Sequence, residues 1–184
     1  MDIYKSLNKQ VVTDGKYSIV PIRHHDRLEI MKWRNEQVFH LRQKKTLTEK
    51  EQDNYFNTVV AGLFDQEQPD QILFSYLKGD NCIGYGGLVH INWTDQNAEI
   101  SFIMDTKLEL DNFEFHWTNF LLLIEKIAFN DLNFHKIFVF AFDVRPHLYK
   151  VSAKCNYFKD AVLKDHCYLD GCFKDVVIYS KLKS

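Results

Sequence analysis

Glu99 is the residue whose type and position first suggest chemistry. It lies in the segment Ala98–Met104, where apolar residues alternate with Glu99 and other side chains. Such alternation indicates a half-buried strand, with Glu99 on the face opposite its apolar neighbours. A carboxylate there either reaches solvent or lines a cavity, where it is able to accept a proton as a general base. His90, in the preceding run Cys82–Asn92, is expected to face Glu99 or to have a structural role only.

The composition indicates a single folded domain over residues 1–184, with a loose lead-in at residues 1–16. Hydrophobic residues make up 46% of the 184 residues and charged residues 26%, which is the usual balance of a globular protein. The net charge of −2 gives no general attraction to nucleic acid or to an anionic membrane. We therefore expect neither as a partner.

Targeting and metal-binding signals are not evident in the sequence. The N-terminal residues lack the apolar core of a signal peptide, and the longest apolar cluster, Phe120–Ile124, is too short to span a bilayer. The four cysteines form no CxxC pair, which favours reduced structural thiols over metal ligands. These features predict a cytoplasmic protein without a metal site.

Hydrophobic periodicity predicts an α/β chain in which strands and helices share one mixed sheet. Asp26 is expected to cap the first helix, Thr48 and Glu51 to form a capping box at the second, and Asp111 with Glu114 to start the longest. The expected order is strand 17–22, helices 26–35 and 48–63, strands 71–77, 82–92 and 98–104, helix 112–132, strand 136–142, helix 145–155, and strands 157–167 and 172–182.

Four stretches in this order carry a family resemblance: YSIVPIRHHDRLEIMKWRNEQ, CIGYGGLVHINWTDQNAEISFIM, HKIFVFAFDVRPHLYKVSAKCNYF and AVLKDHCYLDGCFKDVVIYSKL. Together they resemble the GNAT superfamily of acyl-CoA-dependent N-acetyltransferases over residues 17–182. The branch that the chain looks most like contains the ribosomal-protein alanine and sugar-nucleotide amine acetyltransferases. The resemblance implies a GNAT-like, mostly antiparallel sheet of six to seven strands flanked by about four helices.

The resemblance also implies that acetyl-CoA binds where two central strands separate at one end. The pantetheine arm would pair with the free edge of residues 100–105, as an added strand does. A backbone N–H near Ile103 or Met104 would polarise the thioester carbonyl, and the pyrophosphate would lie at the N-terminus of the longest helix. The residues expected to contact the cofactor are Phe102, Ile103, Met104, Lys107, Asn112, Phe113 and Arg145.

Two departures from the family pattern leave alternatives open. Residues 108–115 contain no glycine where the family has a glycine-rich phosphate loop, and they carry three carboxylates. A non-catalytic binding protein on the same scaffold is therefore the alternative to an enzyme. In the late helix the position of the usual tyrosine acid falls on Ser152, with Tyr149 one turn earlier, and Arg145 replaces the usual asparagine.

The resemblance implies an N-acetyltransferase in which a primary amine attacks the thioester directly while Glu99 accepts its proton. Ser152 or Tyr149 would protonate the leaving thiolate. An amino-sugar nucleotide is expected as acceptor ahead of a protein N-terminus, and a homodimer is allowed. The segment that relatives place over the acceptor contributes the candidate acceptor contacts Arg34, His40 and Arg42, whose structural alternative is a solvated helix edge. The central hairpin contributes His90 and Trp93, and the structural alternative for Trp93 is that it closes the turn.

Overall fold

One sheet of eight strands organises the chain in a computed structural model that describes residues 2–183. The strands lie in the order β1-β2-β3-β4-β5-β6-β8-β7, and within the described residues only β5 and β6 pair in parallel. Their bounds are β1 Val12–Asp14, β2 Tyr17–Pro21, β3 Ile72–Lys78, β4 Asn81–Asn92, β5 Asn97–Met104, β6 Lys136–Phe142, β7 Phe158–Leu169 and β8 Cys172–Leu182.

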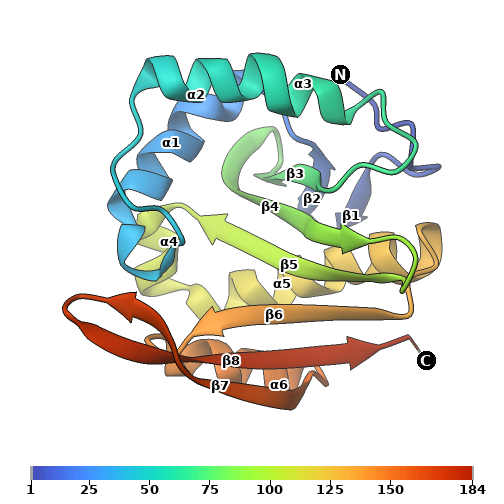
Figure 1. Cartoon of the computed structure of the whole chain (residues 1–184). Coiled ribbons are helices and arrows are strands. Elements are labelled where there is room, and N and C mark those ends of the chain that lie inside the picture. The colour runs from blue at the N-terminus through green and yellow to red at the C-terminus, as the bar shows by residue number, and fades with distance from the viewer. Residues whose placement is uncertain (1, 184) are drawn as a thin grey trace.

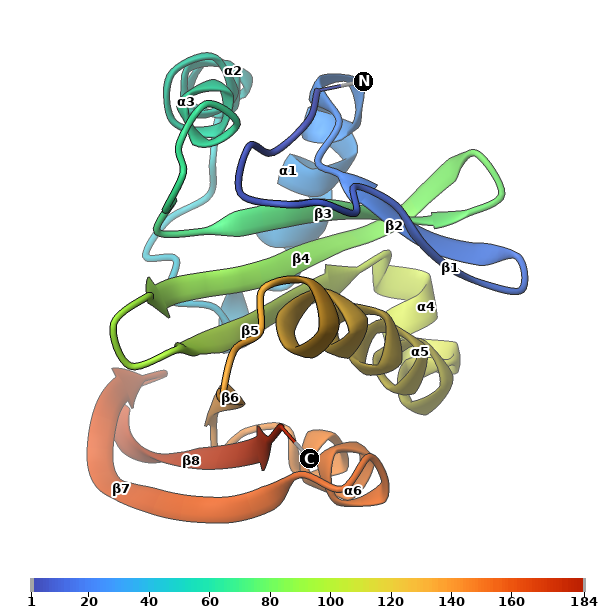
Figure 2. The same cartoon turned by 90° about the vertical axis from the view of Figure 1, so that its right-hand side faces the viewer.

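Helices cover both faces of this sheet. Helices α1 to α3 lie on one side of it and α5 and α6 on the other (Figure 2). The helices are α1 Arg27–Glu36, α2 Glu49–Tyr55, α3 Ala61–Leu63, α4 Thr106–Asp111, α5 Phe113–Glu125 and α6 Pro146–Lys154, with short 3-10 turns at His24–Asp26 (η1) and Val38–His40 (η2) and π-helical segments at Phe56–Val60 (η3) and Lys126–Asp131 (η4).

The predicted fold class is confirmed, with differences in detail. The sheet has eight strands instead of six to seven because β1 lies inside the predicted lead-in. That lead-in is also packed: Tyr4 is 1% exposed, and its hydroxyl donates to the Leu73 carbonyl and accepts from the Leu73 N–H, both at 2.9 Å. Among the described residues, no helix has the length and apolar composition needed to cross a bilayer.

Of the three predicted N-terminal helix caps, one is observed as predicted. Thr48 and Glu51 form the expected capping box at α2. Asp26 precedes α1, but its carboxylate accepts hydrogen bonds from Arg23 and Ser75 and caps no backbone group. The expectation that Asp111 starts the longest helix is wrong, because Asp111 ends the extra helix α4 and α5 begins at Phe113.

Close packing between β4, β5 and α5 fixes the centre of the sheet. The rings of Phe102 and Phe120 stack with their centroids 4.0 Å apart. A Cβ at Gly86 would lie 2.2 Å from the Ser101 carbonyl oxygen and 2.9 Å from the Phe120 ring. Only glycine fits at this position, since any side chain would force β4 and β5 apart.

The strands β5 and β6 separate after three paired residues. Their register runs from Asn97↔Lys136 to Glu99↔Phe138, although β5 continues to Met104 and β6 to Phe142. Figure 1 shows the two strands close together at one end and diverging at the other. The wedge-shaped opening that the family resemblance implies is therefore present.

Candidate active site

A cavity of about 350 Å³ lies in the opening between β5 and β6. Side chains from β4, β5, β6, the N-terminal part of α6 and the connection between α1 and α2 line it. At the narrow end it reaches Glu99, and at the wide end it reaches Arg145. The cavity therefore joins the predicted general base to the predicted path of the pantetheine arm.

Glu99 lines this cavity and is not a solvent-exposed strand residue. Its side chain is 11% exposed, and both carboxylate oxygens accept hydrogen bonds from Nη2 of Arg42, at 3.0 and 3.1 Å. Burial raises the pKa of Glu99 above its usual range, and the positive charge of Arg42 opposes that rise. The sequence allowed the carboxylate either to reach solvent or to line a cavity, and the structure shows that it lines a cavity.

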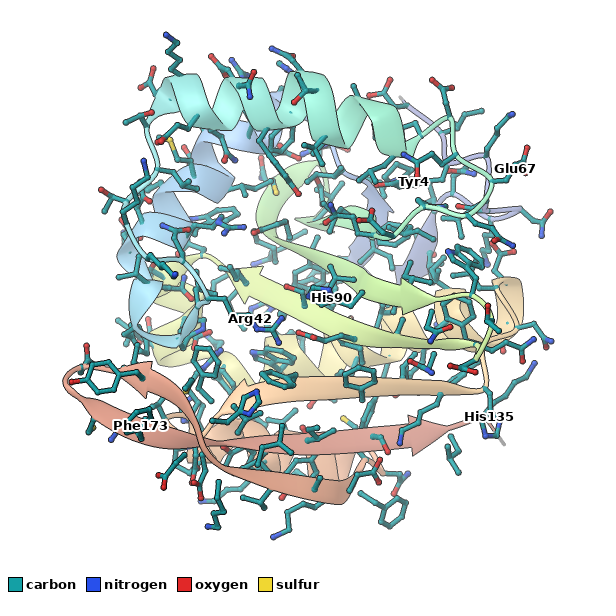
Figure 3. The ribbon with its side chains drawn as sticks, in the orientation of Figure 1. Tyr4, Arg42, Glu67, His90, His135 and Phe173 are labelled. Carbon is teal, nitrogen blue, oxygen red and sulfur yellow. The ribbon has the colours of Figure 1, made fainter. Side chains whose placement is uncertain are left out.

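His90 joins this pair because β4 is irregular at that point. Its backbone has a φ of 49°, and the pairing of β4 with β5 is interrupted between Val89 and Asn92. A bulge turns a side chain out of the regular alternation, and here it leaves Nε2 of His90 4.0 Å from Glu99 and 3.0 Å from Nη1 of Arg42. Figure 3 shows Arg42 and His90 near each other over the centre of the sheet.

A buried ion pair closes the wide end of the opening. Arg145, which follows β6, donates from Nη2 to Glu109 of α4 at 2.5 Å, and its side chain is 7% exposed. The guanidinium carbon lies 5.0 Å from the centroid of the Phe113 ring. Arg145 Nε and Glu109 Oε2 have no partner among the described residues. This pair links the chain that follows β5 to the chain that follows β6.

His40 completes this cluster from the connection between α1 and α2. Its Nδ1 lies 3.1 Å from Nη1 of Arg145, and its Nε2 lies 3.2 Å from the side-chain oxygen of Gln37. Burial, and then the charge of Arg145, lower the pKa of His40 from 6.5 to about 3. The imidazole is therefore neutral at physiological pH.

The low pKa of His40 predicts that acid weakens the fold. Between pH 6.5 and pH 3 the unfolded chain binds a proton at His40 that the folded chain does not. The free energy of unfolding should therefore fall as the pH is lowered through this window, by roughly 2–4 kcal/mol. Urea denaturation of the wild type and of His40→Gln at several pH values should show a flatter dependence in the variant. Equal slopes would contradict the prediction.

The free edge of β5 presents Met104 and not Ile103 to the opening. The N–H of Asp105 donates to the Ile83 carbonyl of β4, and backbone groups alternate in direction along a strand. Ile103 therefore points its backbone toward β4, where it pairs with Tyr85, while Met104 points away. The Met104 carbonyl accepts from the Gln37 side chain at 2.8 Å. Ile103 therefore lines the cavity through its side chain, and its backbone N–H is not directed into the opening.

The expected phosphate end is built by α4 instead of a glycine loop. Lys107 and Asn112 are exposed there and do not line the cavity, whereas Phe113 is buried beneath Arg145. Two of the three carboxylates are paired, Glu109 with Arg145 and Glu114 with Lys154. Glu109 and Glu114 are therefore each neutralised by a side chain of the protein itself.

The two predicted proton donors and the predicted acceptor contact Trp93 also lie outside the cavity. Ser152 is fully buried and donates its hydroxyl to the Leu148 carbonyl at 2.9 Å. The Tyr149 hydroxyl donates to Asp143, and the Trp93 indole donates to the Pro69 carbonyl and packs on Phe134. The structure supports neither Ser152 nor Tyr149 as the proton donor, and it gives Trp93 the turn-closing role.

Sequence reasoning missed several residues that line the cavity. The hydroxyl of Tyr85 accepts a hydrogen bond from Arg34 at 2.8 Å, and Arg34 also binds Gln43 at 3.0 Å. Tyr85 lies cross-strand from Ile103, a pairing that depends on the register shift between Val89 and Asn92. Phe140 lies 4.3 Å beneath the Arg42 guanidinium, although nothing in its strand marks it as a site residue. The remaining unpredicted polar lining comes from Asp70, Gln71 and Ser101.

A family described as the acetyltransferase (GNAT) domain matches residues 19–151, which include most of β2, all of β3 to β6 and most of α6. The chain belongs to the GNAT acetyltransferase family. It is an acetyl-CoA-dependent N-acetyltransferase of the GNAT type. A comparison with curated protein sequences finds no significant match.

Solved structures of spermidine N-acetyltransferase from Vibrio cholerae share this fold. The complex with CoA and spermine superposes with a TM-score of 0.78 at 18% identity, covering 92% of this chain and 97% of the other. A dodecameric form superposes with a TM-score of 0.77 at 18% identity, covering 93% and 96%. At this identity the likeness establishes the fold.

The residues along the wedge fit the arm of acetyl-CoA better than the phosphate end fits its diphosphate. The backbone of Phe102 and Met104 faces the opening by the same alternation that directs Asp105 to β4. An extended amide chain is able to pair with such an edge. At the other end, Arg145 is already paired with Glu109, and the N-terminus of α5 is the remaining anion-binding feature.

Proposed function

We propose that this GNAT enzyme acetylates the primary amine of a small molecule that also carries an anionic group. An amino-sugar nucleotide is the preferred class, and a protein N-terminus is the next. The observation that carries this proposal is the pair of guanidinium groups of Arg34 and Arg42 in the cavity, of which Arg34 bonds only neutral side chains among the described residues. Guanidinium groups bind phosphate and carboxylate through paired hydrogen bonds.

Glu99 supplies the general base in this proposal. The acceptor amine must lose a proton as it attacks, and Glu99 is the buried carboxylate at the narrow end of the cavity. Its raised pKa brings it nearer to the pH at which a base works efficiently. When bound, acetyl-CoA supplies the acetyl group as a thioester. The N–H of Met104 faces the opening and is positioned to donate to a developing oxyanion there.

A polyamine acceptor is the second candidate, since the Vibrio cholerae structures bear the name of a spermidine acetyltransferase and one contains spermine. A polyamine carries several positive charges, so it binds best to unpaired carboxylates. Here Glu99 is already paired with Arg42, and Arg34, which bonds only the neutral side chains of Gln43 and Tyr85 among the described residues, would repel the ligand. These charges favour the anionic amine. The comparisons offer no support for a peptide N-terminus, which stays a prediction.

A comparison of acceptors tests the proposal. The protein and acetyl-CoA are incubated in three separate reactions with an amino-sugar nucleotide, with spermidine and with a peptide that has a free N-terminus. The products are measured by mass spectrometry. We expect the nucleotide to be favoured by about tenfold or more in kcat/KM, equivalent to one charge-assisted contact. Preferred acetylation of spermidine would refute the proposed acceptor class. Calorimetry with acetyl-CoA tests the non-catalytic alternative, which predicts no heat at millimolar ligand.

A further inference from the structure

Arg42 is hydrogen bonded to the carboxylate of Glu99, the group that the reaction needs as its general base. One of its nitrogens donates to both oxygens of Glu99, at 3.0 and 3.1 Å, and the other lies 3.0 Å from His90. A carboxylate that is fully engaged by a guanidinium is a poorer proton acceptor, because protonation must first break this ion pair. In this arrangement Glu99 is present in the cavity but is not free to act as a base.

Arg42 is the partner in this pair that a solute is able to reach. Its side chain is 45% exposed, whereas that of Glu99 is 11% exposed. It belongs to the irregular connection between η2 and α2, and its guanidinium carbon lies 4.3 Å from the centroid of the Phe140 ring. A ligand entering the cavity therefore meets the guanidinium before it meets the carboxylate. An anionic group on that ligand would compete with Glu99 for the same donors.

We propose that Arg42 is a specificity-determining switch, released from Glu99 by the anionic group of the acceptor. This rests on the proposed function, since it requires an acceptor that carries an anion beside its amine. When the anion takes the guanidinium, Glu99 is freed to accept the proton of the attacking amine. The new nitrogen–carbon bond forms as the carbon–sulfur bond breaks, with the electron pair leaving on sulfur. An amine without an anion meets a base that is still paired.

A plain structural ion pair makes a different prediction from a switch. If Arg42 only holds Glu99 in place, removing it should impair all acceptors alike. If Arg42 is a switch, removing it should impair the anionic acceptor and improve the anion-free one, because Glu99 is then unpaired for both. The ratio of the two rates therefore separates these roles, and the absolute rate does not.

Arg42→Met is tested with glucosamine and glucosamine 6-phosphate, two amines that differ by one phosphate. Arg27→Met is the matched control, since Arg27 pairs with Asp53 outside the cavity. We expect the wild type and the control to favour the phosphorylated amine by about tenfold or more in kcat/KM. In Arg42→Met the phosphorylated amine should lose about tenfold and the unphosphorylated amine should gain a few-fold.

Nuclear magnetic resonance without acetyl-CoA gives a readout that does not depend on turnover. Glucosamine 6-phosphate should shift the Arg42 Nε and Glu99 carboxyl-carbon signals together, and glucosamine should shift neither. An unmoved Arg42 signal, or equal rate losses on both amines in Arg42→Met, would overturn the switch and leave the acceptor class intact. A wild type that favours glucosamine would overturn the acceptor class and the switch with it. If neither amine is acetylated, the resonance signals of Arg42 and Glu99 decide for or against the switch.

Discussion

The Glu99→Gln variant is expected to lose about two to four orders of magnitude in kcat, the usual contribution of a general base. Glutamine preserves the shape of the side chain and still accepts from Arg42, but its amide cannot take up the amine proton. The affinity for acetyl-CoA should remain within about twofold, since the variant removes a proton acceptor and leaves the β5 edge unchanged. Steady-state kinetics and calorimetry measure the two quantities.

Asp95→Asn provides the matched control on the same hairpin. Asp95 is exposed in the turn between β4 and β5, and within residues 2–183 its side chain and N–H bond only Asn92. The same change from carboxylate to amide there should leave kcat within about twofold, because a surface substitution outside the cavity disturbs little. If Glu99→Gln kept the wild-type rate, Glu99 would not be the base.

The second large effect is expected on stability, at the ion pair of Arg145 with Glu109. Glu109→Ala should lower the free energy of unfolding by about 3–5 kcal/mol. The substitution leaves the guanidinium of Arg145, which is 7% exposed, as a buried charge without its carboxylate. Because Arg145 Nε already has no partner in the described structure, little remains to compensate the loss. Urea denaturation followed by circular dichroism measures the change.

Glu114→Ala is the control, since Glu114 pairs with Lys154 and both side chains are largely exposed. Its expected cost is about 0–1 kcal/mol. Combining Glu109→Leu with Arg145→Met should recover much of the stability, as apolar replacements of buried ion pairs often do. Equal effects of Glu109→Ala and Glu114→Ala would show that the buried pair contributes no more than a surface one.

Local signals in the sequence were sufficient for most of the fold. The alternation in Ala98–Met104 predicted the strand that became β5 and the orientation of Glu99. The Thr48 capping box predicted the start of α2 because a cap depends on residues only three positions apart. The family resemblance implied the separation of β5 from β6, which no local pattern in either strand specifies.

The candidate site was less predictable because its contacts are distant in sequence. Arg42 and Glu99 are separated by 57 positions, and Arg145 and His40 by 105. The face on which His90 lies depends on a bulge that has no glycine or proline to mark it. Ser152 was predicted by transferring a position from the family pattern, and that pattern does not show that its hydroxyl donates within α6.

The ion pair at the wide end of the wedge has a consequence for ligand entry. Backbone pairing holds β5 and β6 together at Glu99 and Phe138, and Arg145 with Glu109 ties the segments that follow them. The distance between the strands is thus set before any ligand arrives. An incoming thioester arm would not have to separate β5 from β6. Less of its binding free energy is therefore lost to ordering the protein.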